Sequence, residues 1–223
     1  MCCLSWIGVT NFAVYAQEAV LAAARPAVLT TLHADIKQAV IVYKTFATDF
    51  KATLSAWERV DENSWYPVFE NLEAVSGKNG FAPQGEKMEG DGRTPSGIFD
   101  LSYAFGYDAS VQTKLDYRQA MDNDFWVDDP ESLLYNQWVR GTPPAKSYER
   151  MKRDDDLYKY GIVIDYNSNP VIPNYGSAIF LHIWRGPDQP TSGCVALAEE
   201  NVLKLLQWLS KAANPVIVIG YDL

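Results

Sequence analysis

Short apolar runs, rich in β-branched residues and separated by polar loops, constrain the fold of this chain more than any other feature. The clearest runs occupy residues 38–43, 160–166, 177–183 and 215–220. Weaker candidates occupy residues 53–60, 65–69 and 97–101. Each run has the length of a strand, whereas only residues 198–212 place their apolar side chains on one helical face. The pattern predicts a mainly β fold, in which two sheets pack as in a β-sandwich and a few helices surround them.

The composition and charge of the chain narrow the classes of protein to which it can belong. The chain has 223 residues, 48% of them hydrophobic, which is the size and make-up of one well-packed domain. Its net charge of −9 argues against nucleic acid as a partner, because nucleic-acid-binding proteins present basic patches. No apolar run beyond the N-terminal segment is long enough to predict a membrane-spanning helix.

Residues 1–16 are predicted to be a signal peptide. Residues 7–16 are mostly apolar and end in Val14-Tyr15-Ala16, a small-x-small pattern that a signal peptidase can cut before Gln17. No Lys or Arg precedes Arg25, so the positive segment that usually opens such a peptide is missing. An ordinary N-terminal segment is therefore the alternative. We expect export to the periplasm or cell envelope.

The rest of the chain is predicted to form a linker at residues 17–37 and one domain at residues 38–223. Within this domain, residues 107–160 carry many acidic and aromatic side chains and contain two adjacent prolines, so they are predicted to form an inserted flap. The aromatic side chains of the flap either line a peptide-binding cleft or pack the insertion itself. They are Trp126, Tyr135, Trp138 and Tyr148.

Cysteine and histidine are scarce in this sequence. Removal of the leader would take away Cys2 and Cys3 and leave Cys194 as the only thiol. A lone thiol in an oxidising compartment is a liability unless it is buried or reactive. The histidines are His33 and His182, without the spacing of a zinc site, so we expect no metal.

The segment from His182 to Cys194 predicts a nucleophile and a base at the two ends of one loop. A thiol near neutral pH needs a base to form a thiolate, and imidazole is the usual one. Gly193 has no side chain, so its amide and that of Cys194 can face a developing oxyanion. The helix expected to follow would lower the pKa of the thiol a little further. These residues also allow a second interpretation, in which Cys194 is a small buried apolar residue and His182 a hydrogen-bonded core histidine.

Two sequence blocks resemble the catalytic domain of the L,D-transpeptidase (YkuD-type) family. The blocks are GDGRTPSGIFDL at residues 90–101 and FLHIWRGPDQPTSGCVAL at residues 180–197. The resemblance covers about residues 38–220. It implies the β-rich fold of that family, a nucleophile at Cys194, and a base at His182 that the backbone carbonyl of Ile183 orients. It implies no cofactor and no metal.

The resemblance also implies acyl transfer on peptidoglycan peptides. The Cys194 thiolate would attack the carbonyl between the third residue of a stem tetrapeptide and its terminal D-alanine. An amine would then resolve the thioester, which yields a cross-link or an attachment to the wall, and a carbapenem would inhibit the enzyme by acylating Cys194. Two alternatives stay open. With water as acceptor the protein would be an L,D-carboxypeptidase or amidase, and with an unreactive cysteine it would be a wall-binding module.

The sequence departs from the family pattern at two positions, which marks a divergent branch. Ile183 stands where the family often has Gly, and Ala196 stands where it often has Arg. The candidate substrate-binding residues are Trp184, Arg185 and Ser192. The guanidinium of Arg185 can hold a substrate carboxylate through two parallel hydrogen bonds, and an ordinary salt bridge is the alternative.

Overall fold

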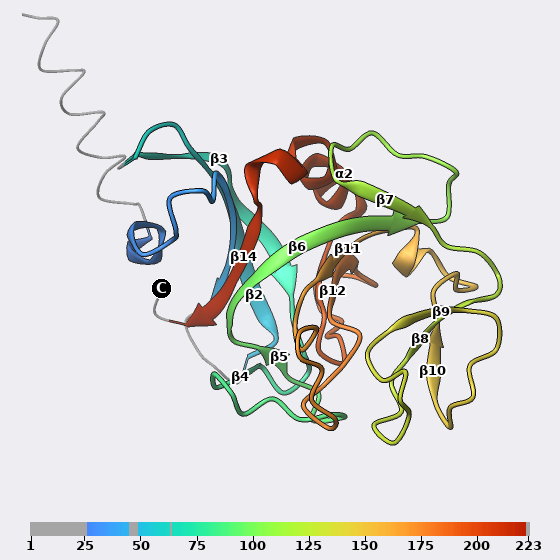
Figure 1. Cartoon of the computed structure of the whole chain (residues 1–223). Helices are drawn as coiled ribbons and strands as arrows, with labels where there is room; N and C mark the ends of the chain where they lie inside the picture. Colours follow the sequence, from blue (N-terminus) through green and yellow to red (C-terminus); the bar gives the residue numbers. More distant parts are fainter. Residues whose placement is uncertain (1–25, 45–48, 63, 222–223) are drawn as a thin grey trace, which may run out of the picture.

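A sheet that closes on itself forms the body of the molecule (Figure 1). The computed structural model describes residues 26–44, 49–62 and 64–221. The strands of the sheet are β1 (Gln38–Lys44), β2 (Lys51–Arg59), β3 (Trp65–Val75), β6 (Gly97–Gly106), β7 (Asp116–Gln119), β11 (Tyr160–Ile164), β12 (Phe180–Ile183), β13 (Val195–Leu197) and β14 (Val216–Tyr221). Their order is β11-β12-β13-β3-β2-β1-β14-β6-β7, and a further pairing of β11 with β6 closes the barrel.

The mainly β prediction is confirmed, but the structure shows a closed, barrel-like sheet with small extra sheets and no clear two-sheet sandwich, because one long strand pairs on both sides of the closure. The first part of β6 pairs with β14, up to Asp100, and its remainder from Leu101 pairs with β11. β7 then pairs in parallel with the end of β6. Apolar runs in the sequence locate strands but do not reveal which strands pair, so the closure was not predictable from them.

The core explains why several strands read as unbroken apolar runs. In β1, Val40 and Val42 belong to the main core of the barrel, whereas Ala39 and Ile41 pack into a second cluster with Leu29. Both faces of β1 are therefore buried, which favours a continuous apolar sequence over an alternating one. The predicted helix is confirmed as α2 (Glu199–Trp208), whose apolar face joins the main core.

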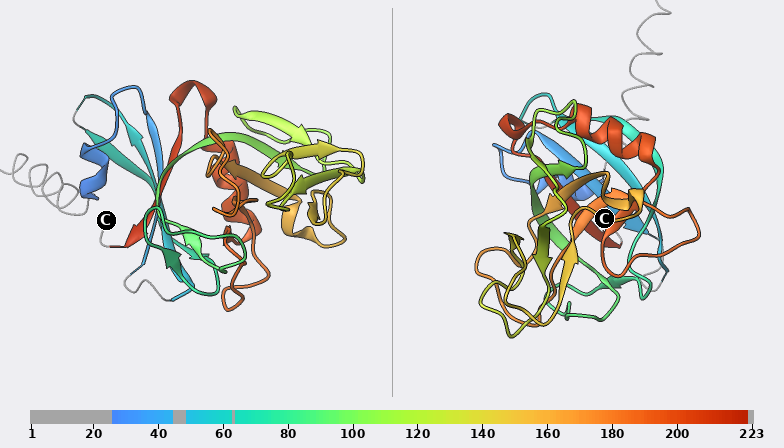
Figure 2. Two further views of the ribbon diagram at one scale, coloured as in Figure 1. Left: turned by 60° about the horizontal axis from the view of Figure 1, so that its bottom comes forward. Right: turned by 90° about the vertical axis from the view of Figure 1, so that its right-hand side faces the viewer.

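The predicted flap contains a small separate sheet that packs beside the barrel (Figure 2). It consists of β8 (Asp124–Val127), β9 (Trp138–Arg140) and β10 (Tyr148–Arg150), and the short helix η2 (Asp156–Tyr158) follows it. Trp126 packs edge-on against Phe180 of β12, with ring centroids 4.9 Å apart. None of the four aromatic residues singled out from the sequence lines the cleft described below; Trp126 and Tyr135 are buried in the packing of the flap, whereas Tyr148 is exposed.

The remaining elements lie before β1, between β3 and β6, and between α2 and β14. They are η1 (Ala27–Thr30), β4 (Phe81–Ala82), β5 (Thr94–Pro95) and η3 (Lys211–Ala213). The predicted signal peptide at residues 1–16, with Cys2 and Cys3, lies outside the described residues, and the predicted domain boundaries stay a prediction. Among the helices that the structure describes, none has the length and apolar character needed to cross a membrane.

Candidate active site

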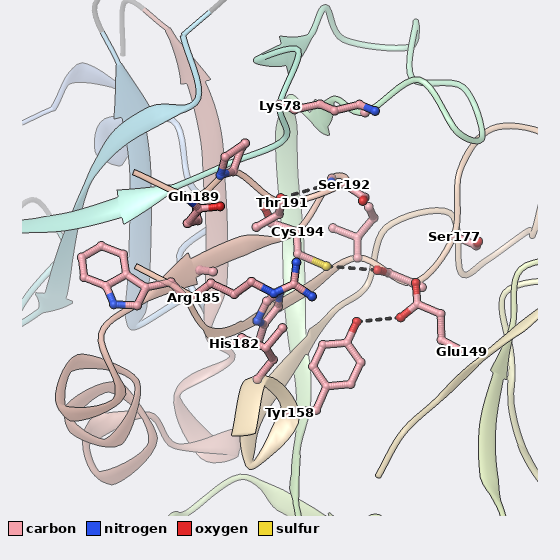
Figure 3. Close-up of a pocket in the computed structure, with 18 of the residues that line it drawn as sticks. Lys78, Glu149, Tyr158, Ser177, His182, Arg185, Gln189, Thr191, Ser192 and Cys194 are labelled. Carbon is pink, nitrogen blue, oxygen red and sulfur yellow. Dashed lines mark hydrogen bonds between the residues drawn. The ribbon is translucent and has the colours of Figure 1, made fainter. Parts of the chain in front are cut away.

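A cleft of about 290 Å³ opens beside β12 and β13 and contains both Cys194 and His182 (Figure 3). Its walls come from four segments: the loop before β5, the end of the flap with η2, residues 177–179 before β12, and the loop between β12 and β13. β12 and β13 are parallel neighbours, with His182 paired with Ala196 in the register. This pairing brings His182 and Cys194, the predicted base and nucleophile twelve positions apart in the sequence, to one place.

Cys194 lies directly before β13, a strand that was not predicted between the motif and the helix. The helix α2 begins five residues later, at Glu199, after a strand that was too short to recognise from the sequence. The Cys194 side chain is buried, with 8% of its surface exposed. Its Sγ donates to the backbone oxygen of Ala178 at 3.3 Å and accepts from the amide of Phe180 at 3.4 Å. The helix therefore gives the thiol no direct contact with its N-terminal amides.

His182 is held in one orientation by its own strand. Its Nδ1 lies 2.7 Å from the backbone oxygen of Ile183. Because a carbonyl oxygen can only accept, Nδ1 carries the proton, and Nε2 is free to act as a base. The Ile183 side chain packs into the barrel core, so this position accommodates a residue larger than glycine. The backbone carbonyl of Ile183 still accepts the hydrogen bond from His182. The ring of Tyr158 packs edge-on against the imidazole, with centroids 5.1 Å apart.

Burial keeps both groups of this pair neutral at rest. Burial and, second to it, the nearby Glu149 raise the pKa of the Cys194 thiol to about 12, whereas burial lowers the pKa of His182 to about 4. The sequence predicted the opposite direction for the thiol, because it does not show how deeply the sulfur lies. Among the described residues, both hydrogen bonds of the sulfur go to backbone atoms, so the resting site holds a thiol and a neutral imidazole.

These pKa directions predict how the protein reacts with an alkylating agent. A thiol whose pKa is about 12 loses its proton only well above neutral pH, so iodoacetamide should modify Cys194 slowly, at a rate that rises through pH 10. The measurement is the alkylation rate against pH, followed on the peptide that contains Cys194. A plateau of fast alkylation below pH 8 would instead indicate a thiolate paired with an imidazolium.

Thr191 is a site residue that the sequence analysis missed. Its hydroxyl accepts from the amide of Gly193 at 3.1 Å and donates to the backbone oxygen of Cys194 at 2.7 Å. The Gly193 amide expected to face an oxyanion is therefore engaged by Thr191 in this structure. A Cβ at Gly193 would lie 3.0 Å from the Arg93 oxygen, so this position needs glycine for the close approach. A Thr two residues before a Gly is a recognisable turn signal.

The three predicted substrate-binding residues lie on the cleft. Trp184, Arg185 and Ser192 all line it, and the side chain of Arg185 is 62% exposed. The carboxylate nearest to Arg185 is that of Asp155, at 3.9 Å, which leaves the guanidinium accessible. Ala196, which stands where the family often has Arg, also lines the cleft and is fully buried. The positive charge of Arg185 lies at the exposed rim of the cleft and does not occupy the position of Ala196.

The cleft also contains charged residues that the sequence analysis did not identify. Lys87 is 3% exposed and pairs with Asp91 at 2.8 Å, Arg153 binds Asp155, and Glu149 reaches in from β10. His33 lies elsewhere, exposed and hydrogen-bonded to Asp35. Within the described ranges, no three His, Cys, Asp or Glu side chains are grouped so as to hold a metal ion.

Comparison with known families gives one result. The model of the L,D-transpeptidase catalytic domain (YkuD) matches residues 51–218, about three quarters of the chain. The match includes Cys194 and His182. Searches of curated proteins and of solved structures found no match to this chain.

Proposed function

The chain belongs to the L,D-transpeptidase catalytic domain (YkuD) family, and from this membership we propose that it is a cysteine-dependent L,D-transpeptidase acting on peptidoglycan stem peptides. One observation carries the proposal most directly. Cys194 and His182 line the same cleft, and the contact of Nδ1 with Ile183 leaves Nε2 free to act as a base. Family membership supports the proposed substrate class, and the geometry supports the proposed roles of the two residues.

In the proposed reaction, the Cys194 sulfur attacks the carbonyl before the terminal D-alanine of a stem tetrapeptide. Nε2 of His182 takes the thiol proton and passes it to the leaving D-alanine amine. An amine acceptor then resolves the thioester. Because the resting pair is neutral, the proton moves during the attack and not before it, once the thiol turns from Ala178 toward the imidazole.

One observation favours an alternative from another class. The buried, protonated thiol, bonded to backbone atoms, is what a wall-binding module with an unreactive cysteine would also have. Incubation of the purified protein with muropeptides, followed by mass spectrometry of the products, separates the candidates. Cross-linked products support the transpeptidase, whereas shortened tripeptides alone indicate the L,D-carboxypeptidase. Unchanged muropeptides, together with no carbapenem adduct on Cys194, would support the wall-binding module.

Arg185 is proposed to bind a substrate carboxylate at the rim of the cleft. Arg185→Ala should lower kcat/KM by about tenfold or more, because a charged hydrogen bond is lost. Arg185→Lys should recover only part of this, since an ammonium cannot form two parallel hydrogen bonds with a carboxylate. Steady-state kinetics with a tetrapeptide donor measure both. Wild-type kinetics for Arg185→Ala would instead show that the residue only neighbours Asp155.

Export to the periplasm or cell envelope is part of the proposal, because the proposed substrate is wall peptide. Its support is the apolar leader and the Val14-Tyr15-Ala16 site. N-terminal sequencing of protein recovered from an envelope fraction should start near Gln17. Uncleaved protein found only in the cytosol would contradict this part of the proposal.

A further inference from the structure

The carboxyl group of Glu149 lies in the cleft, where its negative charge disfavours the thiolate form of Cys194. It belongs to β10 of the flap and lines the cleft together with Cys194 and His182. Its Oε2 accepts a hydrogen bond of 2.6 Å from the hydroxyl of Tyr158. Its negative charge raises the pKa of the Cys194 thiol and so makes the thiolate harder to form. A neutral glutamine could accept the same hydrogen bond without this cost, so the bond to Tyr158 alone does not account for an acid here.

The cations near Glu149 are each paired with another carboxylate, although the charge of Arg153 partly offsets the effect of burial on the Glu149 pKa. Arg153 lies over the ring of Tyr158, but its guanidinium makes two hydrogen bonds to Asp155, at 2.8 and 3.0 Å. Lys87 is paired with Asp91. In the described part of the chain, Glu149 forms no ion pair with any Lys or Arg. Burial raises the pKa of its carboxyl, so a cation that enters the cleft is what would favour its charged form.

The position of Glu149 suits a ligand bound next to the sulfur. In Figure 3, Glu149 and Tyr158 lie on the side of Cys194 toward which the sulfur points, whereas Lys78 and Gln189 lie on the other side of the cleft. A group that approaches a thioester on Cys194 from the Glu149 side would therefore meet a carboxyl that no described cation occupies.

We propose that Glu149 is a further catalytic residue, which binds the ammonium group of the acceptor and takes a proton from it, so that the acyl group passes to an amine in preference to water. The inference rests on the proposed function. An acceptor amine is protonated near neutral pH, so it must be held near the thioester and lose a proton before its nitrogen can attack. A water molecule is neutral and gains no ion pair with the Glu149 carboxylate, whereas an ammonium does. The carboxylate therefore favours attack by the amine over attack by water.

In the proposed step, the attacking nitrogen loses two protons. The Glu149 carboxylate takes one proton from the ammonium, and the free amine forms a C–N bond with the thioester carbonyl carbon. The C–S bond breaks, and a second proton of the attacking nitrogen passes through His182 to the Cys194 sulfur. The products are the new amide, the free thiol, a neutral His182 and a protonated Glu149, which returns its proton to water.

The test compares transfer with hydrolysis in the same reaction. The enzyme is incubated with a tetrapeptide donor and increasing concentrations of an acceptor amine, and mass spectrometry measures the ratio of transfer product to hydrolysis product. Glu149→Gln should lower this ratio by about 100-fold or more, the lower end of the range that a positioned general base contributes. Glu149→Asp, whose carboxyl is withdrawn by one methylene, should give an intermediate ratio and serves if the glutamine variant does not fold.

A matched control removes the same charge elsewhere on the flap. Glu131 is exposed and ion-paired with Lys146, and it does not line the cleft, so Glu131→Gln should keep the wild-type ratio. An unchanged ratio in Glu149→Gln would overturn the inference, and so would an equal loss of both products. If wild-type enzyme forms neither product and no thioester, the proposed function itself fails, and that outcome is distinguishable from a failure of Glu149 alone.

Discussion

Cys194→Ala is expected to abolish turnover and to leave the protein folded. No other described residue offers a thiol in the cleft, so the thioester cannot form without it. The change removes one buried sulfur and its hydrogen bonds to Ala178 and Phe180. We expect this to lower the free energy of unfolding by only about 1–2 kcal/mol, because one small group and two weak hydrogen bonds are lost.

Two measurements on the purified variant check this expectation. Turnover of a tetrapeptide donor should fall to background, and thermal unfolding should show one cooperative transition close to that of the wild type. Retained turnover in a folded Cys194→Ala protein would contradict the whole scheme. Loss of folding would make the activity result uninformative, and Cys194→Ser, which keeps the size of the side chain, then serves instead.

His182→Ala is expected to reduce kcat by about 100-fold to 10,000-fold, the range that a positioned general base contributes. The effect should be large because the thiol pKa of about 12 leaves almost no thiolate at neutral pH without a base. The matched control is His33→Ala, which changes an exposed histidine outside the cleft and should behave like the wild type. Kinetics on the same donor measure both variants, and an essential His33 would show that the pairing of Cys194 with His182 is wrong.

The sequence predicted the strands of the fold better than it predicted their pairing. The apolar runs at β1, β11, β12 and β14 marked strands buried on both faces. It missed β13, because three residues directly after the Ser-Gly-Cys motif are too short to show a period.

The candidate site divides in the same way into predictable and unpredictable parts. The motif and the family resemblance pointed to Cys194 and His182, since few thiols and imidazoles were available to choose from. Glu149 and Tyr158 carry no such signal, because they reach the cleft only through the packing of the flap against β12. The protonation of Cys194 was not predictable either, because it depends on burial that the folded chain alone creates.

The central claim is that the acyl group of the substrate becomes bonded to the Cys194 sulfur. Rapid quenching of the enzyme during turnover of a tetrapeptide donor, followed by intact-protein mass spectrometry, tests it most directly. The account predicts an added mass equal to the donor less its terminal D-alanine, located by digestion on the peptide that contains Cys194 and missing in Cys194→Ala. Product formation with no added mass at any quench time, or with the acyl group on another residue, would contradict it.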